Sequence, residues 1–218
     1  MITIIYTFHN RLEYNKIVFP QLLKEIKNAD FLINDIFIYD DMSKDGSTEY
    51  IQKMLKDNNI KHNFYRKEYN SSVKQLQHTV ENCKTKYIIK IDSDILIPDN
   101  YITTLYNVME KTRKDVGFLA ARETGDLPKI EDNLTLEETR NIGGVGIFRR
   151  KVFNEKLYPF DRYYGFTKFQ WSNLAKKYWI TGMTNTVLDK SLAFSRVEEY
   201  TSLNWSRNVN GAKNYIRK

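Results

Sequence analysis

Residues 87–94 read Tyr87-Ile-Ile-Lys-Ile-Asp-Ser-Asp94, a short run rich in isoleucine that ends in two acids. Short apolar runs with β-branched residues are typical of strands that a parallel sheet buries on both faces. Two carboxylates separated by one small residue suit a hard cation such as Mn2+ or Mg2+ and leave room for phosphate oxygens. An Asp-x-Asp pair is common on protein surfaces, but its place at the end of a buried strand favours a metal site at Asp92 and Asp94.

The rest of the first half of the chain repeats a strand followed by a helix. Short apolar runs predict further strands at residues 2–7, 36–39, 60–66 and 116–121. Apolar residues at helical spacing predict helices through residues 12–26, 51–55, 72–83 and 101–111. This alternation implies parallel strands joined by crossover helices, so we predict an α/β fold with a mostly parallel sheet flanked by helices.

The pattern changes after Ala121. Residues 122–141 are polar and acidic, with no apolar run of strand length, and predict a long loop or lid. Residues 142–149 are rich in glycine and predict a strand whose backbone comes close to a neighbour or a ligand. Apolar residues between Trp171 and Trp179 fall at helical spacing and predict a helix that packs on the core.

Length and composition indicate a single domain, residues 1–203, followed by a tail. A chain of 218 residues with 41% hydrophobic and 28% charged residues can bury a proper core, which argues against disorder. No apolar stretch approaches the roughly 18 residues of a membrane span, and the N-terminal run is too short for a signal peptide. We therefore expect a cytoplasmic protein without a transmembrane segment. The single cysteine, Cys83, excludes an internal disulfide and a cysteine-based metal site.

The excess of positive charge lies in the last quarter of the chain. The net charge is +7, and residues 162–218 hold 10 Lys and Arg against 3 Asp and Glu. We assign residues 204–218 to a basic C-terminal tail. With the aromatic residues of this region, such a segment could bind an anionic glycan, a nucleic acid, a membrane surface or a diphosphate. A solvated segment, whose rings pack on the core, explains the same composition.

Three polar clusters follow the predicted strands. They are His9-Asn10-Arg11, Asp40-Asp41 and Asp92-Ser93-Asp94. One such cluster would be ordinary turn chemistry, since Asp, Asn and Ser favour turns and helix caps. In an open parallel sheet, however, ligands bind beyond the carboxyl ends of the strands, where the loops converge. Three clusters at these ends therefore predict a shared binding crevice.

The motifs taken together resemble the nucleotide-binding half of family 2 GT-A glycosyltransferases. The resemblance rests on Ile5-Tyr-Thr-Phe-His-Asn-Arg11, Ile38-Tyr-Asp-Asp-Met-Ser-Lys-Asp-Gly-Ser-Thr48 and Ile89-Lys-Ile-Asp-Ser-Asp94, in the family's order and spacing. It implies a GT-A fold, with a nucleotide-sugar-binding half at 1–120 and an acceptor half at 121–203.

The resemblance also implies roles for individual residues. Thr7, Asn10 and Arg11 would line the nucleotide pocket, and Asp40 or Asp41 would bond the base or ribose. Asp92, Ser93 and Asp94 would carry the metal and diphosphate. The donor would be a nucleotide-diphosphate sugar, with a UDP-sugar favoured, and the cofactor Mn2+ or Mg2+.

The acceptor half departs from the family at its catalytic acid. Where the family often has an adjacent Glu-Asp pair, this chain reads Gly165-Phe-Thr-Lys-Phe-Gln-Trp171. An inverting transfer normally needs a base near the acceptor hydroxyl. Asp161 is our candidate, and the other carboxylates are Glu123, Asp126, Glu131, Asp132, Glu137 and Glu138. Alternatively, the reaction retains configuration and the leaving diphosphate takes the proton.

Positive groups are also required where the nucleoside diphosphate leaves, because its charge must be stabilised as it develops. The candidates are Arg149, Arg150, Lys168, Lys190 and Arg196. Two other functions fit the pattern. One is nucleotidyl transfer, although the phosphate loop Gly-x-Gly-x-x-Gly is absent. The other is a sugar-nucleotide-binding scaffold that has lost its base.

Overall fold

A computed structural model describes residues 1–69, 72–93, 97, 99–111, 116–121, 136–138, 146–151 and 179–183. Several of our sequence predictions lie outside these residues. They are Asp94 as a metal ligand, Asp161 as a base, the tail at 204–218, and the candidate cations Lys168, Lys190 and Arg196. The division of the chain at residues 120 and 203 therefore stays a prediction.

The described elements follow the alternation expected from the sequence. They are β1 (Ile2–Phe8), α1 (Leu12–Asn28), the short 3-10 turn η1 (Asp30–Leu32), β2 (Ile33–Asp40), α2 (Ser47–Asp57), β3 (Asn63–Arg66), α3 (Ser72–Asn82), β4 (Tyr87–Asp92), α4 (Tyr101–Lys111), β5 (Val116–Ala121), β6 (Leu136–Glu138), β7 (Gly146–Arg149) and β8 (Trp179–Met183).

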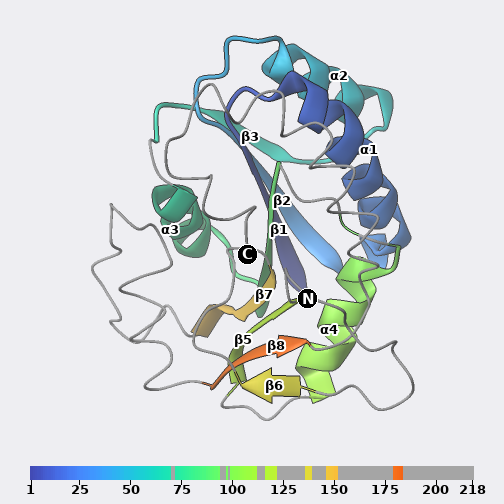
Figure 1. The fold of residues 1–218 in the computed structure, drawn as a ribbon, viewed down its shortest axis with the longest axis vertical. Helices are drawn as coiled ribbons and strands as arrows, with labels where there is room; N and C mark the ends of the chain where they lie inside the picture. Colours follow the sequence, from blue (N-terminus) through green and yellow to red (C-terminus); the bar gives the residue numbers. More distant parts are fainter. Residues whose placement is uncertain are drawn as a thin grey trace, which may run out of the picture.

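The described strands form one sheet in the order β3-β2-β1-β4-β7-β5-β8-β6. The first four are mutually parallel, whereas β7 pairs antiparallel with both β4 and β5, and β6 pairs antiparallel with β8. In Figure 1, α1, α2 and α4 lie on one side of the sheet and α3 lies on the other. The predicted α/β class with a mostly parallel, helix-flanked sheet is confirmed.

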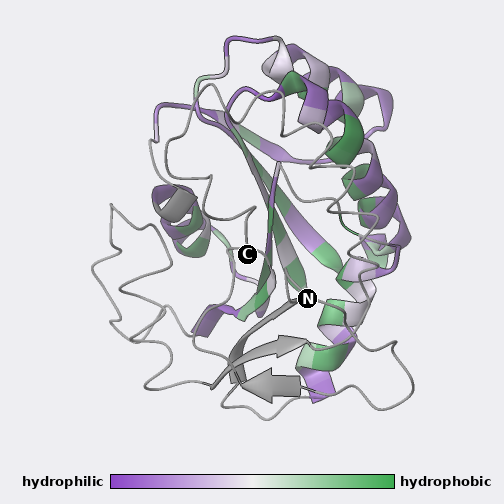
Figure 2. Ribbon diagram, viewed as in Figure 1, coloured by the Kyte–Doolittle hydropathy of each residue, from purple (hydrophilic) through white to green (hydrophobic). Residues whose placement is uncertain are grey.

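The main core fills the space between the sheet and the helices α1, α2 and α4. Every residue of β1 is buried, as expected for a central strand of a parallel sheet. Alternate residues of β1, including Ile4 and Tyr6, pack with Leu22 of α1, Leu55 of α2 and Leu105 of α4. Figure 2 shows hydrophobic colour along β1 and on parts of α1 and α4, and hydrophilic colour over much of α2. Each large apolar side chain buried in this way stabilises the fold by about 1.5–3 kcal/mol.

Two predictions about the second half are wrong. Trp179 was assigned to a helix, but it begins β8 and pairs with Val116 of β5. A short apolar run fits both a helix and a strand, so here the pairing with β5 decides. The interval 122–141, expected to hold no strand, contains β6, which pairs with β8. A strand of three residues is defined by backbone hydrogen bonds to a neighbouring strand, so it needs no apolar pattern of its own.

Cys83 is buried, 3% exposed, directly after α3. None of the described helices is both long and apolar enough to cross a lipid bilayer.

Candidate functional site

The carboxyl ends of β1, β2 and β4 lie side by side, because β1 is the strand between the other two. Thr7 of β1 pairs with Asp92 of β4 and with Tyr39 of β2. The Ser93 amide then donates to the Thr7 carbonyl (3.1 Å), and the Asp41 amide donates to the Phe8 carbonyl (3.0 Å). Two strand spacings, roughly 10 Å, therefore separate the backbones near Asp41 and Asp92.

Strand alternation sends the two neighbouring aspartates, Asp40 and Asp41, to opposite faces of the sheet. Asp40 pairs with Phe8, whose ring belongs to the main core, so its side chain points towards α2. Asp41 points the other way, where its Oδ1 accepts a hydrogen bond from the Tyr69 amide (2.5 Å). The Tyr69 ring packs edge-on against Tyr39, which shares its face with Thr7 and Asp92. Asp41, Thr7 and Asp92 thus share the face of the sheet that carries α3.

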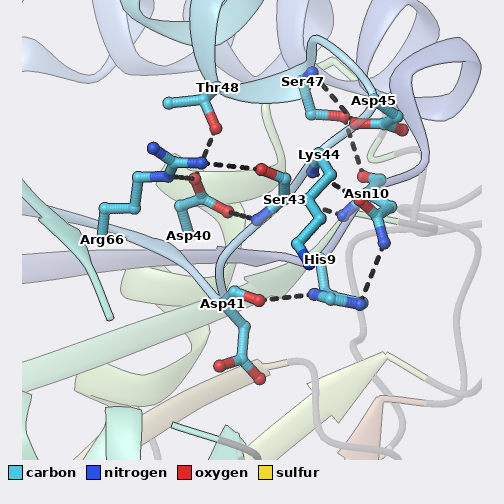
Figure 3. Close-up of polar contacts among 10 residues, drawn as sticks. All are labelled: His9, Asn10, Asp40, Asp41, Ser43, Lys44, Asp45, Ser47, Thr48 and Arg66. Carbon is cyan, nitrogen blue, oxygen red and sulfur yellow. Dashed lines mark hydrogen bonds and ion pairs between the residues drawn. The ribbon is translucent and has the colours of Figure 1, made fainter. Parts of the chain in front are cut away.

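Asp40 is a buried residue whose carboxylate forms hydrogen bonds and an ion pair with neighbouring groups of the protein. It is 0% exposed, and its carboxylate accepts from the Ser43 amide (2.8 Å) and the Thr48 hydroxyl (2.5 Å). The Arg66 Nε lies 3.1 Å from Oδ2 and supplies the compensating charge. Figure 3 shows these contacts, with the Asp41 carboxylate pointing away from them. Of the two aspartates, only Asp41 has a partly exposed carboxylate.

The loop after β1 adopts a strained backbone where it meets the loop after β2. Asn10 (φ 54°), Arg11 (φ 67°) and Met42 (φ 60°) are all left-handed, which costs a non-glycine residue about 1 kcal/mol or more each. Strain of this kind persists only where surrounding contacts over-determine it, and it tends to cluster at functional sites. These three residues flank Asp41 and the end of β1.

Asn10 holds the two loops together. The Asn10 backbone amide donates to the Ser43 hydroxyl (2.7 Å), and the side-chain Oδ1 accepts from the Lys44 backbone amide (2.8 Å). Its Nδ2 lies 3.0 Å from Nε2 of His9, whose Nδ1 lies 2.5 Å from the Asp41 carbonyl oxygen. Figure 3 shows that these contacts join one loop to the other. The Asn10 side chain thus positions Asp41, while its predicted contact with a nucleotide stays a prediction.

Asp45 caps two helices at once. Its Oδ2 accepts from the Leu12 amide at the start of α1 (2.8 Å), and its Oδ1 accepts from the Ser47 amide at the start of α2 (3.0 Å). Neither helix has a side-chain bond from its own N-cap residue. The Asp45 carboxylate thus places a negative charge at the positive ends of both α1 and α2.

Replacing Asp45 with alanine is expected to lower the free energy of unfolding by about 1–2 kcal/mol, since both helices lose a capping bond. The midpoint of thermal unfolding should fall by roughly 2–8 °C for a domain of this size. The control is Asp57→Ala, which removes only an exposed pair with Lys53 in α2 and should change stability by less than about 0.5 kcal/mol. Equal effects of the two variants would contradict the capping role.

Asn15 is a site-supporting residue that our sequence analysis missed. It is fully buried; its Oδ1 accepts from the Tyr6 hydroxyl (2.7 Å), and its Nδ2 donates to the Asn10 carbonyl and the Ser47 hydroxyl (3.1 Å each). These bonds tie β1, α1 and α2 together beneath the strained loop. The sequence does carry a signal, since Asn15 falls on the apolar stripe of the helix at 12–26, where a polar residue needs buried partners.

Asp92 is held by two neighbours on the same face of the sheet. The Thr7 hydroxyl donates to Asp92 Oδ1 (2.7 Å), and the Lys90 ammonium pairs with the same oxygen. The Asp92 side chain is 30% exposed, whereas that of Lys90 is only 3% exposed. The sequence analysis missed Lys90 as well, although a lysine inside an isoleucine-rich strand is itself a signal, because a buried ammonium requires a partner.

The donor set at Asp92 fits a hard cation. Within the described residues both contacts of Asp92 are made by Oδ1, and no group of three or more His, Cys, Asp or Glu side chains gathers there. Mg2+-type sites commonly use one or two carboxylates and take their other ligands from phosphates and water. Asp92 fits this role, with the predicted second carboxylate, Asp94, outside the described residues.

A wall of aromatic rings stands beside Asp41. Tyr39 stacks on Tyr65 (ring centroids 5.3 Å apart) and meets Tyr69 and His78 edge-on. The Tyr39 hydroxyl lies 2.8 Å from His78 Nδ1 and 2.7 Å from the Thr79 hydroxyl of α3. Burial raises the pKa of the Tyr39 phenol well above its usual value, so the hydroxyl stays protonated. The Tyr39 hydroxyl is therefore an uncharged group among these rings.

Arg149 and Arg150, two of the cations considered for the leaving group, lie at the opposite end of β4. The Arg149 guanidinium donates to the Tyr87 hydroxyl (2.9 Å) and to the Met109 carbonyl (2.8 Å). The Arg150 Nε donates to the Thr85 carbonyl (3.1 Å). Tyr87 and Asp92 are the two ends of β4, about 17 Å apart along the strand. Both arginines are structural here, so this prediction is corrected.

Two of the candidate bases, Glu137 and Glu138, belong to β6 at the far edge of the sheet. Four strand spacings, roughly 19 Å, separate β6 from β4. The structure therefore does not bring their backbone together with Asp92. The remaining carboxylate candidates for a base lie outside the described residues.

Comparisons with known proteins identify the family of the chain and show a shared fold. The model of the family described as Glycosyl transferase family 2 matches residues 3–161. No curated protein sequence shows significant similarity to the chain.

Solved structures share the fold at low identity. A mannosyltransferase from Pyrobaculum calidifontis, solved with GDP-Man and Mn2+, is 14% identical with a TM-score of 0.64, over 85% of this chain and 55% of that one. S. aureus TarS 1-349 with UDP-GlcNAc is 14% identical with a TM-score of 0.63, over 85% and 56%. A nucleotidyl transferase from Methanothermobacter is 10% identical with a TM-score of 0.57, over 93% and 98%. The chain thus spans little more than half the length of the first two.

Proposed function

Because the chain belongs to glycosyl transferase family 2, we propose that it moves a sugar from a nucleotide-diphosphate sugar to an acceptor, with the donor bound across the ends of β1, β2 and β4. The observation that carries this proposal is the shared face of Thr7, Asp41 and Asp92. These residues place a carboxylate at each end of a span of roughly 10 Å, which suits a nucleoside diphosphate.

The base of the donor lies next to Asp41 in this proposal. Asp41 is partly exposed, and a carboxylate offers about four acceptor positions. Uracil and guanine both present a ring N–H that can donate a hydrogen bond to such a carboxylate. The mannosyltransferase was solved with GDP-Man and TarS with UDP-GlcNAc, so both bases belong in the test, with a UDP-sugar favoured.

The diphosphate lies next to Asp92. A bound Mn2+ or Mg2+ would neutralise the negative charge that develops on the leaving nucleoside diphosphate. Asp92 would hold this cation, together with Asp94. Thr7 fixes the orientation of the Asp92 carboxylate through Oδ1, which leaves Oδ2 to face the ligand. Asp45 already matches the N-termini of α1 and α2, which makes a cation at Asp92 the more important source of positive charge.

The acceptor side of the reaction belongs to the second half of the chain. Asp161 remains our candidate base for an inverting transfer, and a retaining transfer would let the leaving diphosphate take the acceptor proton. The acceptor is proposed to be a glycan, a cell-surface polymer or a modified nucleic acid, for which the basic tail at 204–218 would supply affinity. Removing that tail should weaken acceptor use more than hydrolysis of the donor, and equal losses in the two rates would contradict this role.

A donor panel distinguishes the three candidate functions. UDP-sugars and GDP-sugars, and in separate reactions UTP or GTP with sugar phosphates, are incubated with the protein, with Mn2+ or with EDTA, and both free nucleoside diphosphate and pyrophosphate are measured. Sugar transfer or donor hydrolysis releases nucleoside diphosphate and requires the cation. A nucleotidyltransferase would instead consume a nucleoside triphosphate and release pyrophosphate. Tight nucleotide binding without any turnover across donors and acceptors would indicate a scaffold.

A further inference from the structure

The strand that carries Asp92 also carries a buried lysine that no step above requires. The Lys90 side chain is 3% exposed, and in the described residues its ammonium pairs with Asp92 Oδ1. Its neighbours across the sheet are Ile5 of β1 and Gly146 of β7. Gly146 has no side chain and so leaves room beside the lysine. The glycine-rich strand predicted from the sequence thus comes close to Lys90.

Stability alone does not account for a lysine at this position. Burying an ammonium is costly, and a buried ion pair usually contributes little more than packed apolar residues of similar size would. Isoleucine occupies the positions on either side, Ile89 and Ile91. The exposed end of the pair is Asp92, 30% exposed, which faces the proposed donor site. The lysine therefore acts on the charge of that site.

We propose that Lys90 is a built-in counter-cation of the donor site, which disfavours binding of the divalent cation alone and favours binding of the nucleotide diphosphate. This inference rests on the proposed function. By pairing with Asp92, Lys90 offsets the negative charge that would otherwise attract a free divalent cation. The same positive charge attracts the diphosphate. In the ternary complex the two effects oppose each other, so Lys90 chiefly disfavours the complex with metal alone.

A charge role and a purely structural role predict different results for Lys90→Met and Lys90→Gln. Loss of the positive charge should tighten binding of Mn2+ to the nucleotide-free protein by about tenfold or more, because a cation touching the same carboxylate is removed. It should weaken binding of UDP in EDTA by about tenfold. UDP affinity at saturating Mn2+ should also fall by about tenfold, because the complex with Mn2+ alone gains stability while the ternary complex changes little. A structural role would weaken all three interactions together.

The measurements are binding assays on the full chain, and turnover is not needed. Free Mn2+ is followed by electron paramagnetic resonance, and UDP, with GDP as a second probe, by calorimetry. Lys86→Met is the matched control, since Lys86 lies just before β4, is exposed and pairs with Glu110. Thr7→Val removes the other donor to Asp92 Oδ1 without changing charge, and it should not tighten Mn2+ binding. Circular dichroism confirms that each variant folds, and Lys90→Gln keeps a polar group if Lys90→Met does not fold.

The outcomes separate the two proposals. Opposite changes in Mn2+ and UDP affinity support the counter-cation role. If the variants lose affinity for both Mn2+ and UDP, or show no change, the counter-cation role is overturned. The proposed function still stands in that case, provided that the unsubstituted protein binds UDP. If the unsubstituted protein binds neither UDP nor GDP, with or without Mn2+, the proposed function fails and this inference fails with it.

Discussion

Replacing Asp92 with asparagine is expected to lower kcat/KM for sugar transfer by about a hundredfold to a thousandfold. The carboxylate is the described group best placed to hold the divalent cation, and asparagine keeps its shape while removing its charge. The amide also leaves the Lys90 ammonium buried without its counter-charge, so some loss of stability is expected in the same variant. The rate should therefore be measured below the unfolding transition, with the folded fraction determined by circular dichroism.

A double substitution separates the chemical effect from the effect on stability. In Asp92→Asn with Lys90→Met, neither charge of the pair remains, so much of the lost stability should return while transfer stays low. Asp99→Asn is the matched control, because Asp99 is an exposed carboxylate that bonds Lys24 (2.7 Å) and Gln21 (2.9 Å) of α1. It should change kcat/KM by less than about twofold. Full activity of the Asp92 variant with unchanged Mn2+ dependence would remove the metal role assigned to Asp92.

Alanine at Asp40 and alanine at Asp41 are expected to have opposite consequences, although the residues are adjacent. Asp40→Ala should lower the free energy of unfolding by about 2–4 kcal/mol, because it leaves the Ser43 amide and the Thr48 hydroxyl without their acceptor. The Arg66 side chain is 45% exposed, so water can solvate its guanidinium when Asp40 is removed. The loss of unfolding free energy should therefore be smaller than for a fully buried ion pair. Urea unfolding measures this change.

Asp41→Ala should lower stability less than Asp40→Ala does, because Asp41 is partly exposed whereas Asp40 is fully buried. It should instead weaken binding of UDP by about tenfold or more, because the proposed contact with the base is lost. Calorimetry on both variants decides between the two residues. A large loss of nucleotide affinity for a folded Asp40 variant, with none for the Asp41 variant, would reverse the assignment.

The sequence predicted where the strands end better than it predicted the buried polar residues that support those ends. The runs at residues 2–7, 36–39 and 87–91 lie within β1, β2 and β4, because buried parallel strands have a composition that is visible locally. Asn15 and Lys90 were missed because each is one polar residue inside an apolar pattern, and only its buried partners give it a role. Trp179 was misassigned because the residues that pair with it lie more than 60 positions earlier, in β5.

The sequence by itself determined the fold class, the family and the cluster of acids at the end of the fourth strand, since these follow from local composition and from motifs in a fixed order. Only the tertiary structure decided which aspartate is buried next to α2 and which lies on the face of the sheet that carries α3. Asp40 and Asp41 have the same chemistry and are adjacent in sequence. The alternation of the strand and the packing of α2 and α3 on opposite faces of the sheet give them different surroundings.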